Sequence, residues 1–434
     1  MEILYFRHPG APVELPAIAA RAGDFIFYAG AIAAHPVKGI PREMVPHRGF
    51  PYHFSSIDAQ LRYIFGNMSE TLKTAGSSIQ RAMDSNVYQT NLTEIDQAYR
   101  VRKDFFGTVS PPPHLMLMIP ETEVQGTSVV IDMIFLASEA KMDREVPDFN
   151  TEKTPMPAHV QIYGYPICVQ AVRGGGFIFT QGKAASSANG VAPEISGHPD
   201  FPYRHNPIKL QAEYILNFYK SLFEQMGSSL EDVVKAEVYV KNMKDIAGLN
   251  EVWSNFFSSN PPARTITPVN FAVTDIIVEI KLIAVDPKGP YRKEVISSGS
   301  VPKHFNDEPQ AIKAGPYLFL SQLLATDYQE GVAPEARVDL NFPYHSSNIK
   351  RQVKYILKNA DAICQAAGIS IKNLVRRRAV HLDLNELSEA EELWRGALGD
   401  RMPPTTTFRA AGPLLSVSGC TVQYDLVAFI PNYP

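Results

Sequence analysis

Residues 201–227 read FPYRHNPIKLQAEYILNFYKSLFEQMG, and this stretch decides the fold because the chain contains it three times. Residues 50–76 read FPYHFSSIDAQLRYIFGNMSETLKTAG, and residues 342–368 read FPYHSSNIKRQVKYILKNADAICQAAG. Eight positions are identical in register and without a gap: Phe-Pro-Tyr, Ile, Gln, Tyr-Ile and Gly. A self-match at this spacing indicates three copies of one unit of roughly 140 residues. We expect the units at residues 1–145, 158–287 and 300–434.

The repeated stretch predicts a long helix. Small and apolar residues of the third copy follow one helical face, at spacings of four and three: Ile349, Val353, Ile356, Ala360, Ile363 and Ala367. Gly76, Gly227 and Gly368 are expected to cap the helices, since glycine adopts a positive φ without a Cβ clash. Phe-Pro-Tyr is interpreted as a staple that packs against the helix start, and lining of a cleft by its tyrosine is the alternative.

Each unit is predicted to run β-β-α-β-α-β-β, an α+β arrangement of two helices on a mixed sheet. A glycine-containing turn before aromatic and aliphatic residues indicates an opening hairpin at residues 21–27, 173–179 and 313–319. The second face of each sheet needs a cover, which another copy can supply. We therefore expect an intramolecular pseudo-trimer, with polar linkers near residues 140–158 and 287–303.

Bulk properties argue against several classes of protein. The net charge of -4 disfavours a nucleic-acid-binding surface, and the arginine run at residues 376–378 is interpreted as a solvated face. No apolar run reaches the roughly 18 residues of a membrane span, and no signal peptide is evident. Cys168, Cys364 and Cys420 form no CxxC motif, so neither a disulfide framework nor a metal site is predicted. A cytoplasmic location without a membrane partner is expected.

Three short motifs carry a family resemblance that covers all three units and is strongest in the second. Residues 227–235 read GSSLEDVVK, residues 262–265 read PART, and residues 278–280 read VEI. These motifs resemble the Rid family, also called YjgF-like. The resemblance implies a fold like the trimeric bacterial chorismate mutase, with ligand clefts between subunits. It also implies hydrolysis of reactive enamines and imines, such as 2-aminoacrylate, to a keto acid and ammonia.

The resemblance assigns the chemistry to Arg264 and to Glu279, fifteen residues later. Arg264 is expected to hold a substrate carboxylate, because a guanidinium binds it through two parallel hydrogen bonds. Glu279 is expected to activate water or to carry a proton, since one carboxyl group can serve both steps of imine hydrolysis. No cofactor is expected, because the C=N bond is already electrophilic. A buried structural ion pair is the alternative for Glu279, which lies among apolar residues.

Other family positions correspond to candidate substrate-binding residues of the second copy: Tyr165, Gln181, Gly182 and Asn250. The first copy has His114 and Asp132 in place of the arginine and the glutamate, and the third copy has Thr406 and Gln423. Units one and three are therefore predicted to have degenerate sites, and acid–base work by the His114 and Asp132 pair is the alternative for unit one. We expect one dominant site per chain, walled by unit two and one neighbour.

The leading hypothesis is a hydrolase of the imine or enamine deaminase type, which acts on a small carboxylated substrate and releases ammonia and a carbonyl product. Two alternatives remain open: a non-enzymatic ligand-binding or scaffold protein, and a lyase or hydrolase acting on a carboxylated ring compound. The assembly is expected to be a monomeric pseudo-trimer or a homodimer of pseudo-trimers. No nucleic-acid partner is expected.

Overall fold

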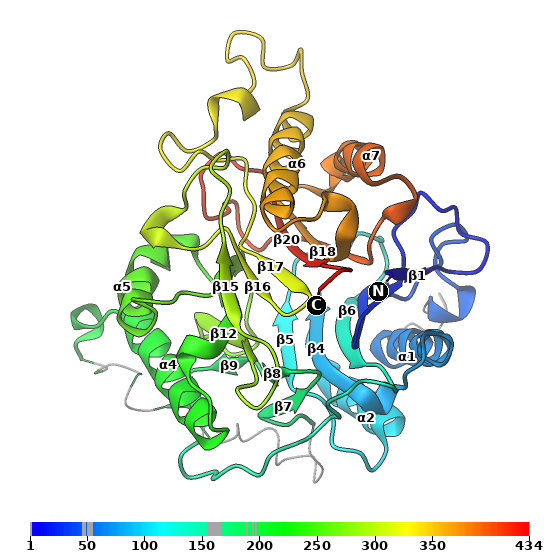
Figure 1. Ribbon diagram of the computed structural model, residues 1–434, viewed down its shortest axis with the longest axis vertical. Helices are drawn as coiled ribbons and strands as arrows, with labels where there is room; N and C mark the ends of the chain where they lie inside the picture. The colour runs from blue at the N-terminus through cyan, green and yellow to red at the C-terminus, as the bar shows by residue number, and fades with distance from the viewer. Residues whose placement is uncertain are drawn as a thin grey trace.

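The computed structural model describes residues 2–45, 49, 55–154, 167–187, 190–192, 195, 198 and 200–433. Three mixed sheets form its centre and the long helices lie outside them, as Figure 1 shows. The predicted α+β class and the three tandem units are confirmed. Within the described ranges, no helix is long and apolar enough to cross a membrane.

The first unit has the strand order β1-β2-β3-β6-β4-β5. Its elements are β1 Leu4–Phe6, β2 Ala19–Ala22, β3 Phe25–Ile32, α1 Ser56–Ala75, β4 Ala82–Gln89, α2 Ile95–Phe106, β5 His114–Met118 and β6 Val129–Leu136. The second unit has the order β13-β12-β14-β8-β7, with β9 also beside β14. Its elements are β7 Ala171–Gly174, β8 Phe177–Thr180, β9 Lys183–Ala184, α4 Pro207–Gln225, β12 Val233–Val240, α5 Ile246–Phe256, β13 Ala263–Pro268 and β14 Val278–Val285, with the small β10 Ser186–Ser187 and β11 Gly190–Val191 pair beside them.

The third unit has the order β15-β16-β17-β20-β18-β19. Its elements are β15 Lys293–Ile296, β16 Ala311–Ala314, β17 Tyr317–Leu320, α6 Asn348–Ala366, β18 Leu374–His381, α7 Leu387–Leu398, β19 Thr405–Arg409 and β20 Val422–Phe429. The order β-β-α-β-α-β-β is confirmed in each unit, and units one and three add a strand before it. Strand β15 lies inside the stretch 287–303 that we expected to be a linker. The unit boundaries themselves stay a prediction.

The repeated residues of the motif have structural roles in each copy. The glycines after the helices have φ values of 79°, 69° and 78°, so the predicted caps are confirmed. Gln60, Gln211 and Gln352 are buried, and each accepts a hydrogen bond, at 2.8 to 3.0 Å, from a backbone N–H just before the closing strand. The glutamine side chain thus connects the helix to its sheet, and it gives a partner to a backbone N–H that would otherwise have none.

Phe-Pro-Tyr does not have the role that we expected. Tyr203 is 99% exposed and Tyr344 is 97% exposed, so neither packs on its helix nor lines a cleft. The first copy, residues 50–52, lies outside the described residues. The helix starts are instead fixed locally: Ser347 accepts a hydrogen bond from the Lys350 amide, and Pro207 stands at the first turn of α4.

Equivalent aromatic residues of the three hairpins meet at the centre of the molecule. The ring centroids of Phe25, Phe177 and Tyr317 lie 5.4, 5.6 and 5.8 Å apart, one residue from each unit. Three equivalent residues in mutual contact define a pseudo-threefold axis. The predicted intramolecular pseudo-trimer is therefore confirmed by these contacts.

Charged residues from all three units fill the space next to the aromatic centre. Four acidic and four basic side chains, each at most 3% exposed, form ion pairs: Asp84, Asp132, Lys235, Glu237, Lys281, Arg376, Arg378 and Asp425. Hydrogen bonds of Asn86 link the Lys281–Asp84 pair to Glu237 and so to the other pairs. We call this set the axial ion network. Its arginines belong to the run 376–378, so the expectation of a solvated face is wrong. The acidic partners come from other units, and the sequence run alone does not contain them.

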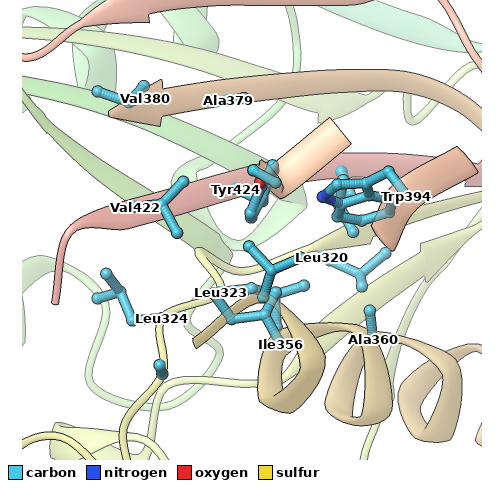
Figure 2. Packing of buried hydrophobic residues seen from close by; sticks show 14 of the residues in the cluster. Leu320, Leu323, Leu324, Ile356, Ala360, Ala379, Val380, Trp394, Val422 and Tyr424 are labelled. Atoms are coloured by element: carbon cyan, nitrogen blue, oxygen red, sulfur yellow. The ribbon is translucent and has the colours of Figure 1, made fainter. Parts of the chain in front are cut away.

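Each unit also has its own apolar core between its helices and its sheet. Figure 2 shows this core in the third unit, where Ile356 and Ala360 of α6 lie against Leu320 and Tyr424. Trp394 of α7 lies beside Tyr424, at a centroid distance of 4.9 Å. The helical face predicted from spacing is confirmed, because its residues from Ile349 to Ile363 are buried.

Gly30 marks a close approach between the first and third units. Its φ is 67°, and a Cβ at this position would overlap the carbonyl oxygen of Thr405. We expect Gly30→Ala to lower the free energy of unfolding by more than about 2 kcal/mol, because backbone strain adds to a clash with a backbone atom. Gly227→Ala is the matched control: its φ is 69°, but no atom lies within 4 Å of the added Cβ. Urea unfolding of both variants measures the difference, and equal losses would contradict the close approach.

Candidate functional site

The units join in a ring through three equivalent interfaces. At each one, the strand after the second helix of one unit contacts the segment after the hairpin of the next. Three hydrogen bonds define these contacts: Gly182 N to His114 O at 3.0 Å, Gln322 N to Arg264 O at 2.9 Å, and Gly30 N to Thr406 Oγ1 at 2.7 Å. We call them the 1–2, 2–3 and 3–1 interfaces, after the units that they join.

The structure does not bring Arg264 and Glu279 together. Arg264 on β13 lies opposite Ala236 of β12, and Glu279 on β14 lies opposite Tyr239 of β12. Ala236 and Tyr239 are three residues apart on one strand, so their side chains point to opposite faces of the sheet, as do those of their partners. Arg264 therefore belongs to the 2–3 interface and Glu279 to the 1–2 interface. The register therefore does not support the single cleft, walled by unit two and one neighbour, in which we expected both residues.

Arg264 already has a carboxylate partner from the chain itself. Its Nη2 forms an ion pair with Glu308 of the third unit and donates a hydrogen bond to Asn250 Oδ1 at 2.8 Å. Its guanidinium lies 4.7 Å from the ring centroid of Trp253, and the side chain is 2% exposed. Arg264 and Asn250 are thus brought together as expected, but Glu308 was missed, because it lies 44 residues away in another unit.

The third copy also has a buried guanidinium, which comes from a neighbouring strand. Arg377 of β18 lies 4.7 Å from the ring centroid of Trp394, the same distance as Arg264 from Trp253. Its Nη2 pairs with both oxygens of Glu391, at 2.6 and 2.7 Å, and its Nε donates to Thr405 Oγ1 at 3.0 Å. At the 3–1 interface, the Arg377 guanidinium is therefore neutralised by Glu391 of the same unit.

The strand registers correct two matches between the copies. Ser85, Ala236 and Arg377 each lie nine residues after the glycine that ends the first helix of their unit. Their partners on the neighbouring parallel strand are His114, Arg264 and Thr405, in that order. Thr405, and not Thr406, is thus equivalent to Arg264. Tyr88, Tyr239 and Val380 each lie twelve residues after that glycine. Their partners on the neighbouring antiparallel strand are Val130, Glu279 and Gln423, in that order. Asp132 is therefore not at the glutamate position; it is a member of the axial ion network.

The 1–2 interface has its guanidinium on a helix. Arg102 of α2 occupies the repeat position that is Trp253 in the second unit and Trp394 in the third, and it is 3% exposed. Its Nη1 donates to Ser85 Oγ at 3.1 Å and its Nη2 to the Ile167 carbonyl at 3.5 Å. Among the described residues, no carboxylate lies within ion-pair distance of it. Burial lowers the pKa of Arg102 to about 10, against the opposing effects of Cys168 and Tyr99, so the guanidinium stays charged at neutral pH.

Glu279 lies at the same interface and has a perturbed pKa. Desolvation raises its pKa to about 8, although Lys281 and Lys183 act in the opposite direction. A Cβ on Gly182 would overlap both the Glu279 carboxylate and Leu115 of the first unit, so glycine is needed there. Glu279 is therefore mostly protonated at neutral pH and lies against the neighbouring unit.

Cys168 and Gln181 complete the second unit's side of the 1–2 interface. The Cys168 Sγ lies 3.6 Å from Gln181 Oε1, and both side chains are buried. Burial raises the pKa of Cys168 to about 12, while Arg102 lowers it and Glu279 raises it further. Cys168 is thus within electrostatic range of both groups. Burial keeps the thiol protonated, so it is not a thiolate nucleophile at neutral pH.

A cavity of about 280 Å³ opens at this interface. Tyr99, Arg102 and Phe106 of α2 line it together with Pro111 and with Ile167 of the second unit. Of the sequence-predicted residues, Gln181, Gly182 and Glu279 lie at the 1–2 interface, and Tyr165 lies outside the described residues. Their roles stay predictions. Arg102 was missed, although a charged residue where two copies have tryptophan was a usable signal.

Comparisons with known proteins identify the fold family. The family description "Endoribonuclease L-PSP" matches residues 166–286, within the second unit. A RutC family protein of Pyrococcus abyssi is 34% identical over 134 residues, which is 31% of this chain and 92% of the relative. A RutC family protein of Haemophilus influenzae is 32% identical over 141 residues, covering 31% of this chain and 94% of the relative.

Two solved structures are also similar to parts of the chain. A Rid family protein from Yersinia pestis is 20% identical, covers 32% of this chain and all of its own, and has a TM-score of 0.26. A chorismatase is 10% identical and covers 80% of this chain and 93% of its own, with a TM-score of 0.47. The sequence relatives, matched over most of their length, decide the assignment. This chain belongs to the endoribonuclease L-PSP family, which is also named the RutC or Rid family.

Proposed function

We propose that the 1–2 interface hydrolyses a small carboxylated imine or enamine and releases ammonia and a carbonyl compound. One observation carries the proposal: a buried guanidinium without a carboxylate partner among the described residues, at an interface that also holds an acid with a pKa of about 8. The guanidinium groups at the other two interfaces are each neutralised by a glutamate. The proposal therefore keeps one dominant site but moves it from Arg264 to Arg102.

Arg102 would bind the substrate carboxylate. Its present partners are a hydroxyl and a backbone carbonyl, which are weaker acceptors than a carboxylate. Its Nε has no hydrogen-bond partner among the described residues, and the adjoining cavity has room for a small ligand. A buried charge without a counter-ion is unfavourable, so a substrate carboxylate would supply the missing charge.

Glu279 would carry the proton. Below its pKa of about 8 the carboxyl group can protonate the imine nitrogen, and the resulting carboxylate can then take a proton from the attacking water. Water adds to the carbon, the C–N bond breaks, and the nitrogen leaves as ammonia while the carbon becomes a carbonyl. An enamine reaches the same path after protonation of its carbon. Atoms and electrons balance with water as the only co-reactant.

Substituting the two arginines separately tests which interface acts. We expect Arg102→Gln to lower kcat/KM for imino acids by about 100-fold, because a desolvated charge-assisted contact contributes about 2–5 kcal/mol. The matched control is the double variant Arg264→Gln/Glu308→Gln, which removes the buried guanidinium of the 2–3 interface together with its carboxylate, so that neither charge is left unpaired. We expect it to retain most of the activity.

The assay follows ammonia release from a panel of imino acids generated in solution, with circular dichroism to confirm that each variant is folded. Loss of activity in the double variant, with Arg102→Gln unaffected, would return the site to the 2–3 interface. A folded parent protein that binds carboxylated compounds without releasing ammonia would favour the ligand-binding alternative instead. Arg102→Lys should restore only part of the activity, since lysine lacks the planar fork.

A further inference from the structure

We propose that Glu308 is an internal stand-in for a ligand carboxylate, which keeps a second carboxylate-binding site closed at the 2–3 interface. Glu308 pairs with Arg264 from the third unit, and its side chain is 11% exposed. The carboxylate thus reaches the guanidinium across a unit boundary. Small free carboxylates are expected to compete with it.

The repeat shows what stands in the same place at the 1–2 interface. The carbonyls of Gln170 and Gln310 accept equivalent hydrogen bonds, each at 2.9 Å, from the residue that follows their hairpin. Two residues before these glutamines stand Cys168 and Glu308. Cys168 interacts electrostatically with Arg102, as Glu308 does with Arg264. At the 1–2 interface this position is therefore a neutral thiol, Cys168. At the 2–3 interface it is a carboxylate, Glu308, which neutralises the arginine.

The internal contact leaves part of the guanidinium unused. Glu308 and Asn250 both bind Nη2, while Nε and Nη1 of Arg264 have no hydrogen-bond partner among the described residues. A free carboxylate can approach a guanidinium through two parallel hydrogen bonds, which the tethered side chain does not make here. A competing ligand therefore has bonding capacity available that Glu308 does not use.

The segment that carries Glu308 is held in an unfavourable backbone conformation. Asn306 and Asp307 have φ values of 56° and 53°, in the left-handed region that non-glycine residues rarely adopt. Phe305 is 60% exposed, and the ring of His304 lies 4.6 Å from that of Tyr328. Left-handed backbone at two successive non-glycine residues costs free energy, although less at asparagine and aspartate, so contacts such as the Arg264–Glu308 ion pair must hold this turn in place.

Acetate rescue of Glu308→Ala tests the proposal, because acetate has the same non-hydrogen atoms as the part of the side chain that the substitution removes. We expect Glu308→Ala to bind acetate at least tenfold more tightly than the parent, with a saturable rise in melting temperature. Sodium chloride at equal ionic strength should not reproduce the rise. The double variant Glu308→Ala/Arg264→Gln should lose it. Glu294→Ala, which removes an exposed partner of Lys313, is the matched control and should behave like the parent.

Two outcomes would overturn the proposal: an equal acetate response in the parent and in Glu308→Ala, or a response that persists without Arg264. If Glu308→Ala folds only in acetate, that rescue supports it. If it does not fold at all, Glu308→Gln decides, because the amide keeps the shape without the charge and should still bind acetate more tightly than the parent does. The assay reads binding at Arg264 and no turnover, so its failure is separate from failure of the reaction proposed at Arg102.

Discussion

Glu279→Gln is expected to lower turnover of imino acids by about 100-fold to 10,000-fold, the usual contribution of a positioned acid–base group. The amide keeps the shape and the position opposite Tyr239 but cannot exchange a proton. Ligand binding through Arg102 should change little, so the loss should appear in kcat rather than in KM. Single-turnover ammonia release at saturating substrate measures it. Full activity of a folded Glu279→Gln variant would remove this residue from the mechanism.

The pH profile supplies an independent readout of the same residue. Since the protonated form acts first, activity should be level below pH 8 and should fall above it as the carboxyl group loses its proton. Stability should follow the same direction. A folded-state pKa raised from 4.5 to about 8 contributes stability that is complete below about pH 4.5 and is lost as the pH rises through about 8. Glu279→Gln should therefore show a flatter stability profile across this range, by urea unfolding at several pH values.

Glu237→Ala is expected to lower the free energy of unfolding by about 3–5 kcal/mol, because it removes one of the buried carboxylates that neutralise Arg376 and Arg378. Glu237 Oε1 lies 3.0 Å from Arg376 and 3.3 Å from Arg378, both of the third unit. Its Oε2 accepts a hydrogen bond from Asn86 of the first unit at 3.1 Å. One side chain of the second unit thus joins all three units, so its loss should weaken their assembly as well as the local ion pairs.

Urea unfolding measures this loss, with Glu70→Ala as the control. Glu70 pairs with Lys73 on the exposed surface of α1, and its removal should change stability by less than about 1 kcal/mol. Burial raises the pKa of Glu237, but Arg378 and Arg376 outweigh it and hold that pKa well below its ordinary range. The stability from this residue is therefore present above about pH 4.5 and is lost on acidification. A loss below 1 kcal/mol in Glu237→Ala would contradict the role of the axial ion network.

The sequence by itself determined the unit, its element order and its helices. Eight identical positions in three copies reveal the repeat, and spacings of three and four along α6 identify the buried face. These features are local, because helix periodicity and glycine caps depend on neighbours within a few residues. The family motifs around Arg264 and Glu279 were also readable, since they are contiguous in the chain.

Only the tertiary structure decided which side chains share an interface. Arg264 and Glu279 are fifteen residues apart on strands that flank β12, yet the register directs them to opposite faces. The three guanidinium groups next to the unit interfaces belong to Arg102, Arg264 and Arg377. These residues occupy three different positions of the repeat, so an alignment of the three copies does not match them with one another. Arg376 and Arg378 are buried because their partners come from other units. A residue's neighbours across a unit boundary depend on packing of distant segments, and spacing along the chain does not encode them.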